Sequence, residues 1–184
     1  VPPSVLMPGI FAANDRLAAE WFAPAGLNRG GIVGAVSVLN RLTHAERDTL
    51  YESKVNPIAS FPGEGIVAFG QKTLQDKASA LDRINVARLV NYMRHNLDQL
   101  SRSFLFEQND KITRDNMRDA VERFCGNLVT QRGLYDFLVV CDESNNTPAR
   151  IDRNELWVDV AIQPAKAVEF IYIPLRIRNT GETL

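Results

Sequence analysis

Cysteine and histidine are scarce in this sequence. Among 184 residues there are 2 cysteines and 2 histidines, and neither Cys125 and Cys141 nor His44 and His95 have the close spacing of zinc ligands. A thiol pair this sparse fits a reducing compartment better than a disulfide scaffold. We expect no metal and no cofactor, and we interpret both cysteines as buried, inert thiols. A Cys–His pair brought together only by the fold stays open as a catalytic arrangement.

Long hydrophobic runs and an excess of charge of one sign are also absent. Charged residues, glycine or proline interrupt each apolar stretch before the roughly 18 residues that a membrane-spanning helix needs. No basic segment followed by an apolar one opens the chain, so no secretory signal is predicted. With 21 Lys and Arg against 22 Asp and Glu the net charge is -1, whereas nucleic-acid-binding domains are usually basic. We therefore expect neither membrane insertion nor direct nucleic-acid binding.

The composition that remains is that of a globular protein. Hydrophobic residues make up 45% of the chain and charged residues 23%, which excludes intrinsic disorder. A chain of this length buries about 70% of its unfolded surface and needs no disulfide or metal to hold a core. The length predicts one domain, or one domain and a fraction.

Prolines and glycines divide the first 64 residues into short elements. Residues 1–9 contain three prolines and are expected to run extended over the surface. Asp15 is predicted to cap a short helix through Trp21, and residues 28–34 are expected to form a flexible connection. We interpret residues 1–64 as an extended arm and a short-helix segment that pack on the core that follows.

A capping box gives a firmer prediction within this segment. Thr43 and Glu46 have the required spacing and predict a helix from residue 45 to about residue 53. Residues 56–57 and 61–65 contain turn formers and are expected to be loops.

Two long amphipathic helices are predicted next. In the first, of about five to six turns, apolar residues are spaced alternately by four and three positions. They are Val86, Val90, Met93, Leu97, Leu100 and Phe104. Thr113 is predicted to cap the second helix and Gly133 to end it. Its apolar positions are Met117, Val121, Phe124 and Leu128.

Apolar, β-branched and aromatic runs predict four strands. They lie at residues 66–69, 135–141, 156–162 and 168–177. Pro174 would place the last strand at an edge of the sheet. We therefore expect an α+β fold, with a mostly antiparallel sheet of about four strands, two long helices on one face and extended terminal arms. Residues 65–184 would form the core domain, including the C-terminal strand or arm.

Two loops resemble ligand sites only superficially. Residues 63–70 contain three glycines but lack the Gly-Lys-Ser/Thr ending of a phosphate loop, so a turn that enters a strand is favoured. Asp142, Ser144 and Asn146 alternate like the start of a calcium loop. Because the sixth and twelfth positions of that loop carry the wrong residues, an Asx turn is favoured.

Arg83, Arg88 and Arg94 give the first long helix a basic side. This side is either a solvated face or a surface complementary to an acidic patch on another copy of the chain, and composition does not choose between the two. His95 is expected on a solvated face of the same helix. Nothing in the residues themselves identifies an active site.

Nearly the whole chain is covered by a series of different short motifs, each of which occurs once. They occur at residues 1–4, 8–12, 21–26, 56–58, 61–65, 69–70, 73–74, 83–89, 104–109, 133–137, 140–148, 151–156, 164–165 and 170–171. Each motif is weak alone, but their order and spacing together resemble the C-terminal region of contractile-tail sheath proteins of large, T-even-like bacteriophages. One departure is Ala87, where many sheath proteins carry a second consecutive arginine.

The resemblance implies a structural protein and not an enzyme. Sheath subunits polymerise as a homopolymer around the tail tube, and contraction drives the tube through the host envelope. The implied partners are other sheath subunits, the tail tube protein, and the baseplate and tail terminator proteins. The implied location is the virion tail, with assembly in the host cytoplasm. In sheath proteins, terminal arms add strands to neighbouring subunits, and complete subunits usually carry further, variable domains upstream.

Two alternatives stay open at this point. The first is the sheath of a bacterial contractile injection system, of the type VI or tailocin kind. The second, from another class, is a small nucleotide-binding hydrolase that uses residues 63–70. A thermal-shift screen with ATP would separate the hydrolase from either sheath.

The resemblance generates a first prediction. Removal of residues 177–184 is expected to leave the domain folded and to prevent polymerisation, because the arm that joins neighbouring subunits would be lost. Circular dichroism would measure the folding, and electron microscopy would detect the polymers. Normal sheaths built from the truncated protein would contradict the prediction.

Overall fold

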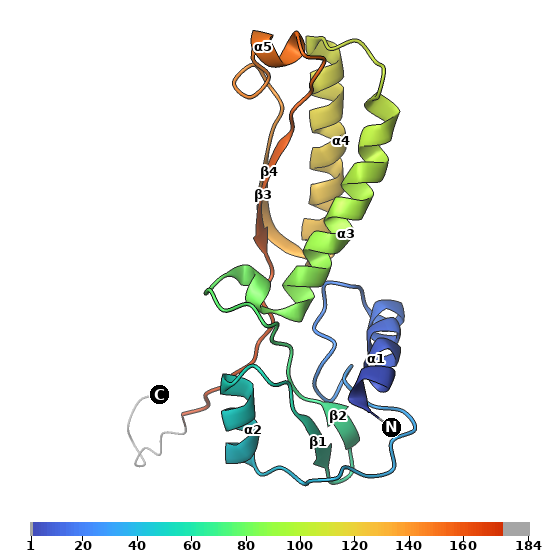
Figure 1. The fold of residues 1–184 in the computed structure, drawn as a ribbon, viewed down its shortest axis with the longest axis vertical. Coiled ribbons are helices and arrows are strands. Elements are labelled where there is room, and N and C mark those ends of the chain that lie inside the picture. Colours follow the sequence, from blue (N-terminus) through green and yellow to red (C-terminus); the bar gives the residue numbers. More distant parts are fainter. Residues whose placement is uncertain (1, 175–184) are drawn as a thin grey trace, which may run out of the picture.

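Two hydrophobic clusters organise the chain into two lobes stacked along its long axis (Figure 1). The computed structural model describes residues 2–174. The lower lobe in Figure 1 contains α1 (Pro3–Leu17), α2 (His44–Glu52), β1 (Ile58–Phe61) and β2 (Gly65–Ala68). The upper lobe contains the 3-10 helices η1 (Ala80–Asp82) and η2 (Arg102–Phe104), the helices α3 (Ile84–Ser101), α4 (Lys111–Thr130) and α5 (Pro148–Ile151), and the strands β3 (Leu134–Val140) and β4 (Asp159–Pro164).

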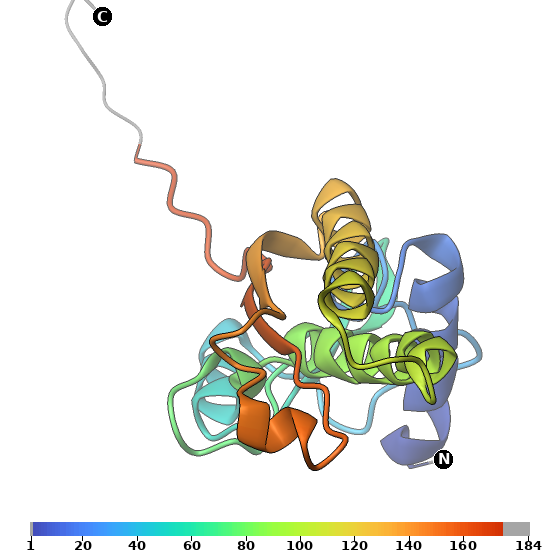
Figure 2. The ribbon, with the colours of Figure 1, turned by 90° about the horizontal axis from the view of Figure 1, so that it is seen from above.

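The two long helices form as the apolar spacing predicts. Leu89 on α3 and Val121 on α4 are each 1% exposed and pack with β3 and Trp21 in the upper core. Figure 2 shows both helices on one side of the β3–β4 pair. The spacing of four and three residues thus places one apolar stripe of each helix against a common core.

The ends of α4 differ from the prediction. Asp110, not Thr113, is the N-cap, and its carboxylate accepts a hydrogen bond from the Thr113 N–H at 2.8 Å. At the other end Arg132 adopts the left-handed conformation, with φ of 64°. The Gly133 N–H then donates to the Leu128 carbonyl at 2.7 Å, which is the outer bond of a Schellman motif.

Gly133 contributes to packing, and the left-handed turn residue is Arg132. A Cβ at this position would lie 3.3 Å from atoms of the Trp21 ring. The Trp21 indole N–H donates to the Gln131 carbonyl at 3.0 Å, so the ring is fixed over the end of α4. This contact brings the N-terminal segment into the upper core.

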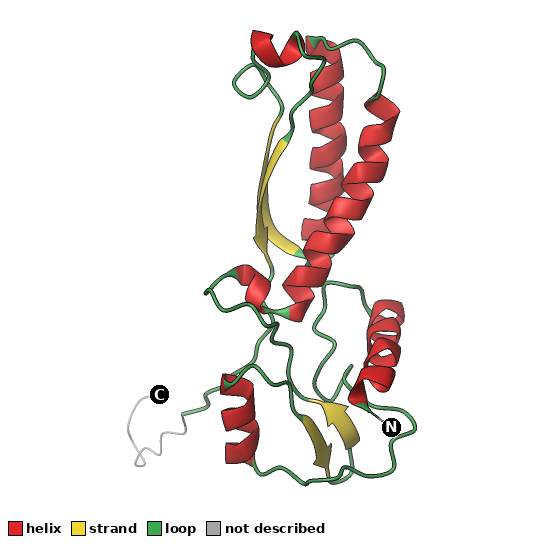
Figure 3. Cartoon of the chain, viewed as in Figure 1, coloured by secondary structure: helices red, strands yellow, loops and turns green. Residues whose placement is uncertain are grey.

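The α+β class and the antiparallel pairing are confirmed, but the strands form two separate pairs (Figure 3). In the lower lobe β1 pairs with β2, with Ile58 opposite Ala68. In the upper lobe β3 pairs with β4, with Val139 opposite Val160. Strand β1 was not predicted, because proline and turn residues flank its four residues.

The predicted C-terminal strand is wrong over residues 168–174, which form no regular element. The rest of that prediction, and the truncated residues 177–184, lie outside the described residues. Strand β4 begins at Asp159, three residues later than expected, because the Trp157 N–H donates to the Asn146 side chain instead of to a strand, at 2.7 Å.

The expectation of an extended N-terminus is also wrong, since helix α1 begins at Pro3. A proline in the first turn loses no helical hydrogen bond, because the first N–H groups have no partner within the helix. Pro8 does remove one bond. The burial of Ile10 and Asn14, at 3% and 0% exposure, favours the helix in spite of this loss.

Asp15 does not cap a second helix, and residues 18–30 are irregular. Residues 28–34 are not a free connection either, because they lie against β2. The Ile32 N–H donates to the Ile66 carbonyl at 2.9 Å, and the Ala68 N–H donates to the Gly30 carbonyl at 2.8 Å. Only glycine fits at position 30, where a Cβ would lie 2.5 Å from the Ala68 carbonyl oxygen.

The capping box at α2 is confirmed. The Thr43 N–H donates to the Glu46 carboxylate at 2.7 Å, and the Thr43 hydroxyl accepts from the Glu46 N–H at 3.4 Å. The backbone hydrogen bond from Thr43 lowers the pKa of Glu46. None of the helices in the described part of the chain is long and apolar enough to cross a membrane.

The upper core gives a second prediction. Leu89→Ala should lower the free energy of unfolding by about 2–5 kcal/mol, because a side chain at 1% exposure leaves a cavity when it is truncated. Leu74 is 86% exposed, and Leu74→Ala should change stability by less than about 0.5 kcal/mol. Urea unfolding followed by circular dichroism measures both. Equal effects of the two substitutions would contradict the assignment of the core.

Candidate assembly interface

The cysteine and histidine side chains lie in opposite environments. Cys125 and Cys141 are 0% and 1% exposed, and burial raises the pKa of the Cys125 thiol to about 11. Both histidines are exposed: His44 pairs with Asp48 at 2.9 Å, and a His95 ring nitrogen lies 2.8 Å from the Gln99 amide. The thiols are therefore in a protonated, buried state without a histidine base. No group of three potential metal ligands occurs among residues 2–174.

The glycine loop at residues 63–70 is a turn that enters a strand, as predicted. The Glu64 N–H donates to the Phe61 carbonyl at 3.1 Å and closes the β1–β2 hairpin. Gly63 and Gly65 have φ values of 81° and 85°, which most other residues avoid. Residues 69–79, which follow β2, form no helix that could direct its N–H groups at a phosphate. The loop therefore lacks the geometry of a nucleotide site.

The polar loop after β3 is an Asx turn, as predicted. The Ser144 N–H donates to the Asp142 carboxylate at 2.8 Å. Asn145 is 8% exposed, and its amide donates to the Asp159 carboxylate at 2.8 Å. Side chains that face inward hold this loop to β4, and they do not converge on a cation.

The basic side of α3 is mostly neutralised within the chain, so a solvated face is the wrong interpretation for Arg83 and Arg88. Arg88 contacts both Asp15 carboxylate oxygens, at 2.6 and 2.8 Å, and its guanidinium lies over the Phe11 ring. This pair fastens α1 to α3. Arg83 pairs with Asp82 at 2.9 Å and with Glu169 at 2.6 Å.

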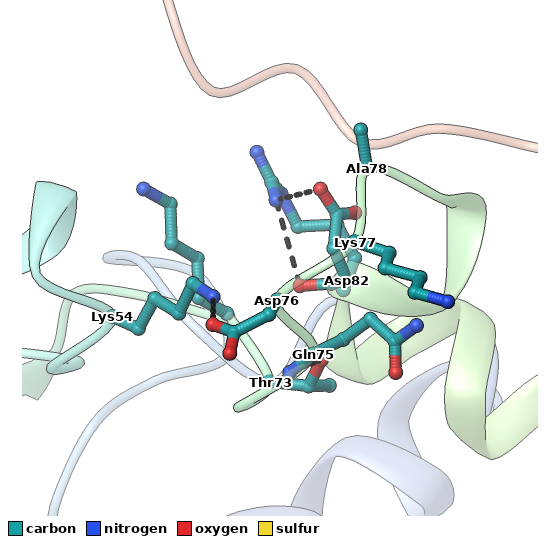
Figure 4. Close-up of a pocket in the computed structure, with 9 residues that line it drawn as sticks. Lys54, Thr73, Gln75, Asp76, Lys77, Ala78 and Asp82 are labelled. Atoms are coloured by element: carbon teal, nitrogen blue, oxygen red, sulfur yellow. Dashed lines mark hydrogen bonds and ion pairs between the residues drawn. The ribbon is translucent and has the colours of Figure 1, made fainter.

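A polar pocket of about 240 Å³ lies between α2 and η1 (Figure 4). Two of its four cations pair with carboxylates: Lys54 with Asp76, and Arg83 with Asp82. Lys72 donates to the Tyr51 carbonyl at 2.6 Å and lies over the Tyr51 ring. Three of the four cations in the pocket thus have partners, and Lys77 is the one for which neither an ion pair nor a side-chain hydrogen bond occurs among residues 2–174.

The most unusual surface is the apolar segment at residues 168–173, which runs away from both lobes (Figures 1 and 2). Its apolar members are Val168, Phe170, Ile171, Tyr172 and Ile173, at 79%, 65%, 77%, 86% and 76% exposure. Soluble proteins rarely expose a contiguous apolar run of this size without a partner. This segment is the first part of the candidate interface.

The second part is the β3–β4 pair, which is an incomplete sheet. Within residues 2–174 no further strand pairs with either member, so one edge of each strand is unpaired. Beside β4 an open groove of about 530 Å³ separates the strand from the ends of α3 and α4. Its apolar lining includes Leu97, Phe104, Met117, Val121, Leu156, Val158 and Val160.

Other exposed apolar side chains lie at the two ends of the molecule. Phe106, between α3 and α4, is fully exposed and has φ of 70°. In the lower lobe Val33, Val36 and Leu39 are 93%, 97% and 99% exposed. The apolar run at residues 168–177 predicted a C-terminal strand or arm, but sequence patterns did not reveal the groove or the other exposed surfaces. An apolar residue looks the same whether a core or a neighbour covers it.

Sequence comparison finds similar tail sheath proteins in several bacteriophages. The chain is 40% identical over 171 residues to the tail sheath protein of Vibrio phage KVP40 and 36% identical over 181 residues to that of Enterobacteria phage T4. These matches cover 93% and 98% of the chain but only 26% and 28% of the two phage proteins. The chain thus spans about a quarter of the length of these curated relatives.

Solved structures show the same fold. A sheath complex of the extracellular contractile injection system PVC, in the contracted state, matches with a TM-score of 0.88 at 24% identity, over 96% of this chain and 51% of that one. The baseplate structure of the anti-feeding prophage contains a chain that matches with a TM-score of 0.86 at 23% identity, over 96% of this chain and 50% of that one.

The family assignment follows from a match over more than half of the chain. Residues 76–178 match the phage tail sheath C-terminal domain, and this stretch includes both long helices and the β3–β4 pair. The chain belongs to the phage tail sheath family, of which it carries the C-terminal domain.

Proposed function

We propose that this chain is part of a contractile tail sheath subunit that polymerises around a tail tube and contracts to drive the tube through the host envelope. The observation that carries the proposal is the combination, in one member of the sheath family, of an exposed apolar arm and a sheet with unpaired edges. The two features are complementary, because the arm could form a strand but has no sheet to join, and the sheet has free edges to which a strand could be added.

The proposed contact between subunits is strand addition. Residues 168–173 leave the junction of the two lobes and run away from their own β3–β4 pair (Figure 1). A neighbouring copy can therefore receive the segment more readily than the same chain can. Main-chain hydrogen bonds to a free strand edge would supply affinity, and the apolar groove beside β4 would receive alternate side chains.

The work of contraction would come from these contacts. A sheath that consumes no nucleotide must store free energy in the difference between two arrangements of its subunits. Even a few kcal/mol per subunit becomes effectively irreversible when many copies switch together. Arms that remain paired while the lobes rotate would keep the polymer connected during the switch.

The remaining parts of the proposal concern partners and location. The proposed partners are other sheath subunits, the tail tube protein, and the baseplate and tail terminator proteins, without direct contact to nucleic acid. The proposed location is the virion tail after assembly in the host cytoplasm, and the proposed role includes no catalysis. The division into a segment of residues 1–64 and a core of residues 65–184 stays a prediction.

A bacterial contractile injection system is the second candidate. The fold match to the PVC sheath supports it, but identity to that protein is only 24%. Identities of 32–40% to three phage tail sheath proteins favour the phage. The hydrolase alternative has no comparable support, since residues 63–70 form a hairpin turn.

The arm gives a third prediction. The double variant Ile171→Ser with Ile173→Ser should fold normally but fail to polymerise, because both side chains are exposed in the subunit and would share one face of the arm once it pairs as a strand. Electron microscopy and sedimentation of the full-length protein measure the polymer, and urea unfolding measures stability. The control is Leu74→Ser, at an equally exposed site outside the arm. Sheaths of normal yield from the double variant would refute the role of the arm.

A further inference from the structure

Glu169 interrupts the exposed apolar run at residues 168–173. Its side chain is only 16% exposed, whereas the neighbouring Val168 and Phe170 are 79% and 65% exposed. A carboxylate that is less exposed than the apolar residues on either side must be held by specific contacts, because burial of an unpaired charge is costly.

The contacts come from three different parts of the chain. Arg83, which precedes α3, binds the Glu169 carboxylate through two parallel bonds, from Nε to Oε1 at 2.6 Å and from Nη2 to Oε2 at 2.9 Å. Gln71, in the link after β2, donates from Nε2 to Oε1 at 3.1 Å. Tyr51 on α2 completes the group, and burial and the Glu169 carboxylate raise its pKa.

The charge of Glu169 is well compensated in this position. Burial alone would raise the pKa of Glu169, but hydrogen bonds from Arg83, Tyr51 and Gln71 outweigh it, and the net shift is downward. The paired geometry with Arg83 is directional as well as strong, because the planar guanidinium and the planar carboxylate fix each other's orientation. Replacement of Arg83 by lysine would keep the charge and lose this orientation.

A second anchor lies four residues earlier. The Ala165 N–H donates to the Gly133 carbonyl at 3.0 Å, and the Ala165 carbonyl accepts a bond from the Asn85 amide at 3.5 Å. Two fixed points, at residues 165 and 169, determine a direction for the chain that follows. With the anchor at Ala165 alone, the segment from residue 166 onward would be free to point in other directions.

We infer that the Arg83–Glu169 pair positions the root of the C-terminal arm and so sets the direction in which the arm leaves the subunit to meet a second copy of the chain. This inference rests on the proposed strand addition and deepens it. Glu169 belongs to neither hydrophobic cluster, so its loss should change the order of the arm more than the stability of the lobes. A longer unrestrained arm lowers the effective concentration of its strand at the neighbour's edge.

The test compares Glu169→Gln and Arg83→Lys in the full-length protein. Matched controls are Glu143→Gln and Arg94→Lys, at exposed positions for which no ion pair occurs among the described residues. In unassembled subunits, a nitroxide spin label at residue 171 should move faster in both variants than in the controls, because the arm would be held only at Ala165. Sedimentation should show that polymers form only at a severalfold higher protein concentration, and electron microscopy should show irregular polymers.

The double variant Arg83→Lys with Glu169→Gln should be no worse than the more severe single variant, since both substitutions remove the same interaction. Should Glu169→Gln fail to fold, Glu169→Asp offers a shorter carboxylate that keeps the charge but shortens the reach to Arg83. Unchanged mobility of the spin label, or greater mobility with polymerisation like that of the controls, would overturn the inference. If the Ile171 and Ile173 double variant also polymerises normally, strand addition itself is refuted. Normal polymerisation of the Arg83 and Glu169 variants alone would refute only the role of the Arg83–Glu169 pair.

Discussion

The structure depends on one constraint: every backbone N–H and C=O of a strand needs a hydrogen-bond partner, and two paired strands satisfy only the groups that face each other. Strands β3 and β4 meet this limit at their outer edges, and only the face toward α3 and α4 is covered. The β3–β4 pair has free edges and an apolar groove beside β4, and the same chain carries an exposed apolar arm without a strand partner among the described residues. The helices cover one face of the β3–β4 pair, and its free edges are where we propose that a neighbouring subunit binds.

Ion pairs at the junction of the two lobes hold α1 and the root of the C-terminal arm against α3 and the residue that precedes it. Arg88 joins α3 to α1 through Asp15, and Arg83 joins the start of α3 to Glu169. Both pairs are partly shielded from water, so they are oriented by several contacts and screened less than surface pairs. The polar groups are thus concentrated where segments distant in sequence meet, and the apolar groups are exposed where another molecule is proposed to bind.

Local patterns in the sequence were sufficient for much of the fold. The apolar stripes of α3 and α4, the capping box at Thr43 and the β-branched run of β3 each depend on near neighbours. The failures involve distant partners. Helix α1 forms despite Pro8 because Ile10 is buried in the lower core, and Arg83 and Arg88 are neutralised by residues 86 and 73 positions away. The division of the strands into two pairs is likewise a tertiary property, and so is the groove, which had no local signal. The arm did have one, in the apolar run that predicted a strand from residue 168 onward.

The length of α3 has a mechanical consequence. At 18 residues the helix is about 27 Å long, and it runs from the junction of the lobes to the edge of the groove. A turn of about 10° around its base would displace its far end by about 5 Å, which is close to the spacing of adjacent strands. A tilt of about 10° at the base of α3 would therefore change the width of the groove beside β4 by about the spacing of one strand.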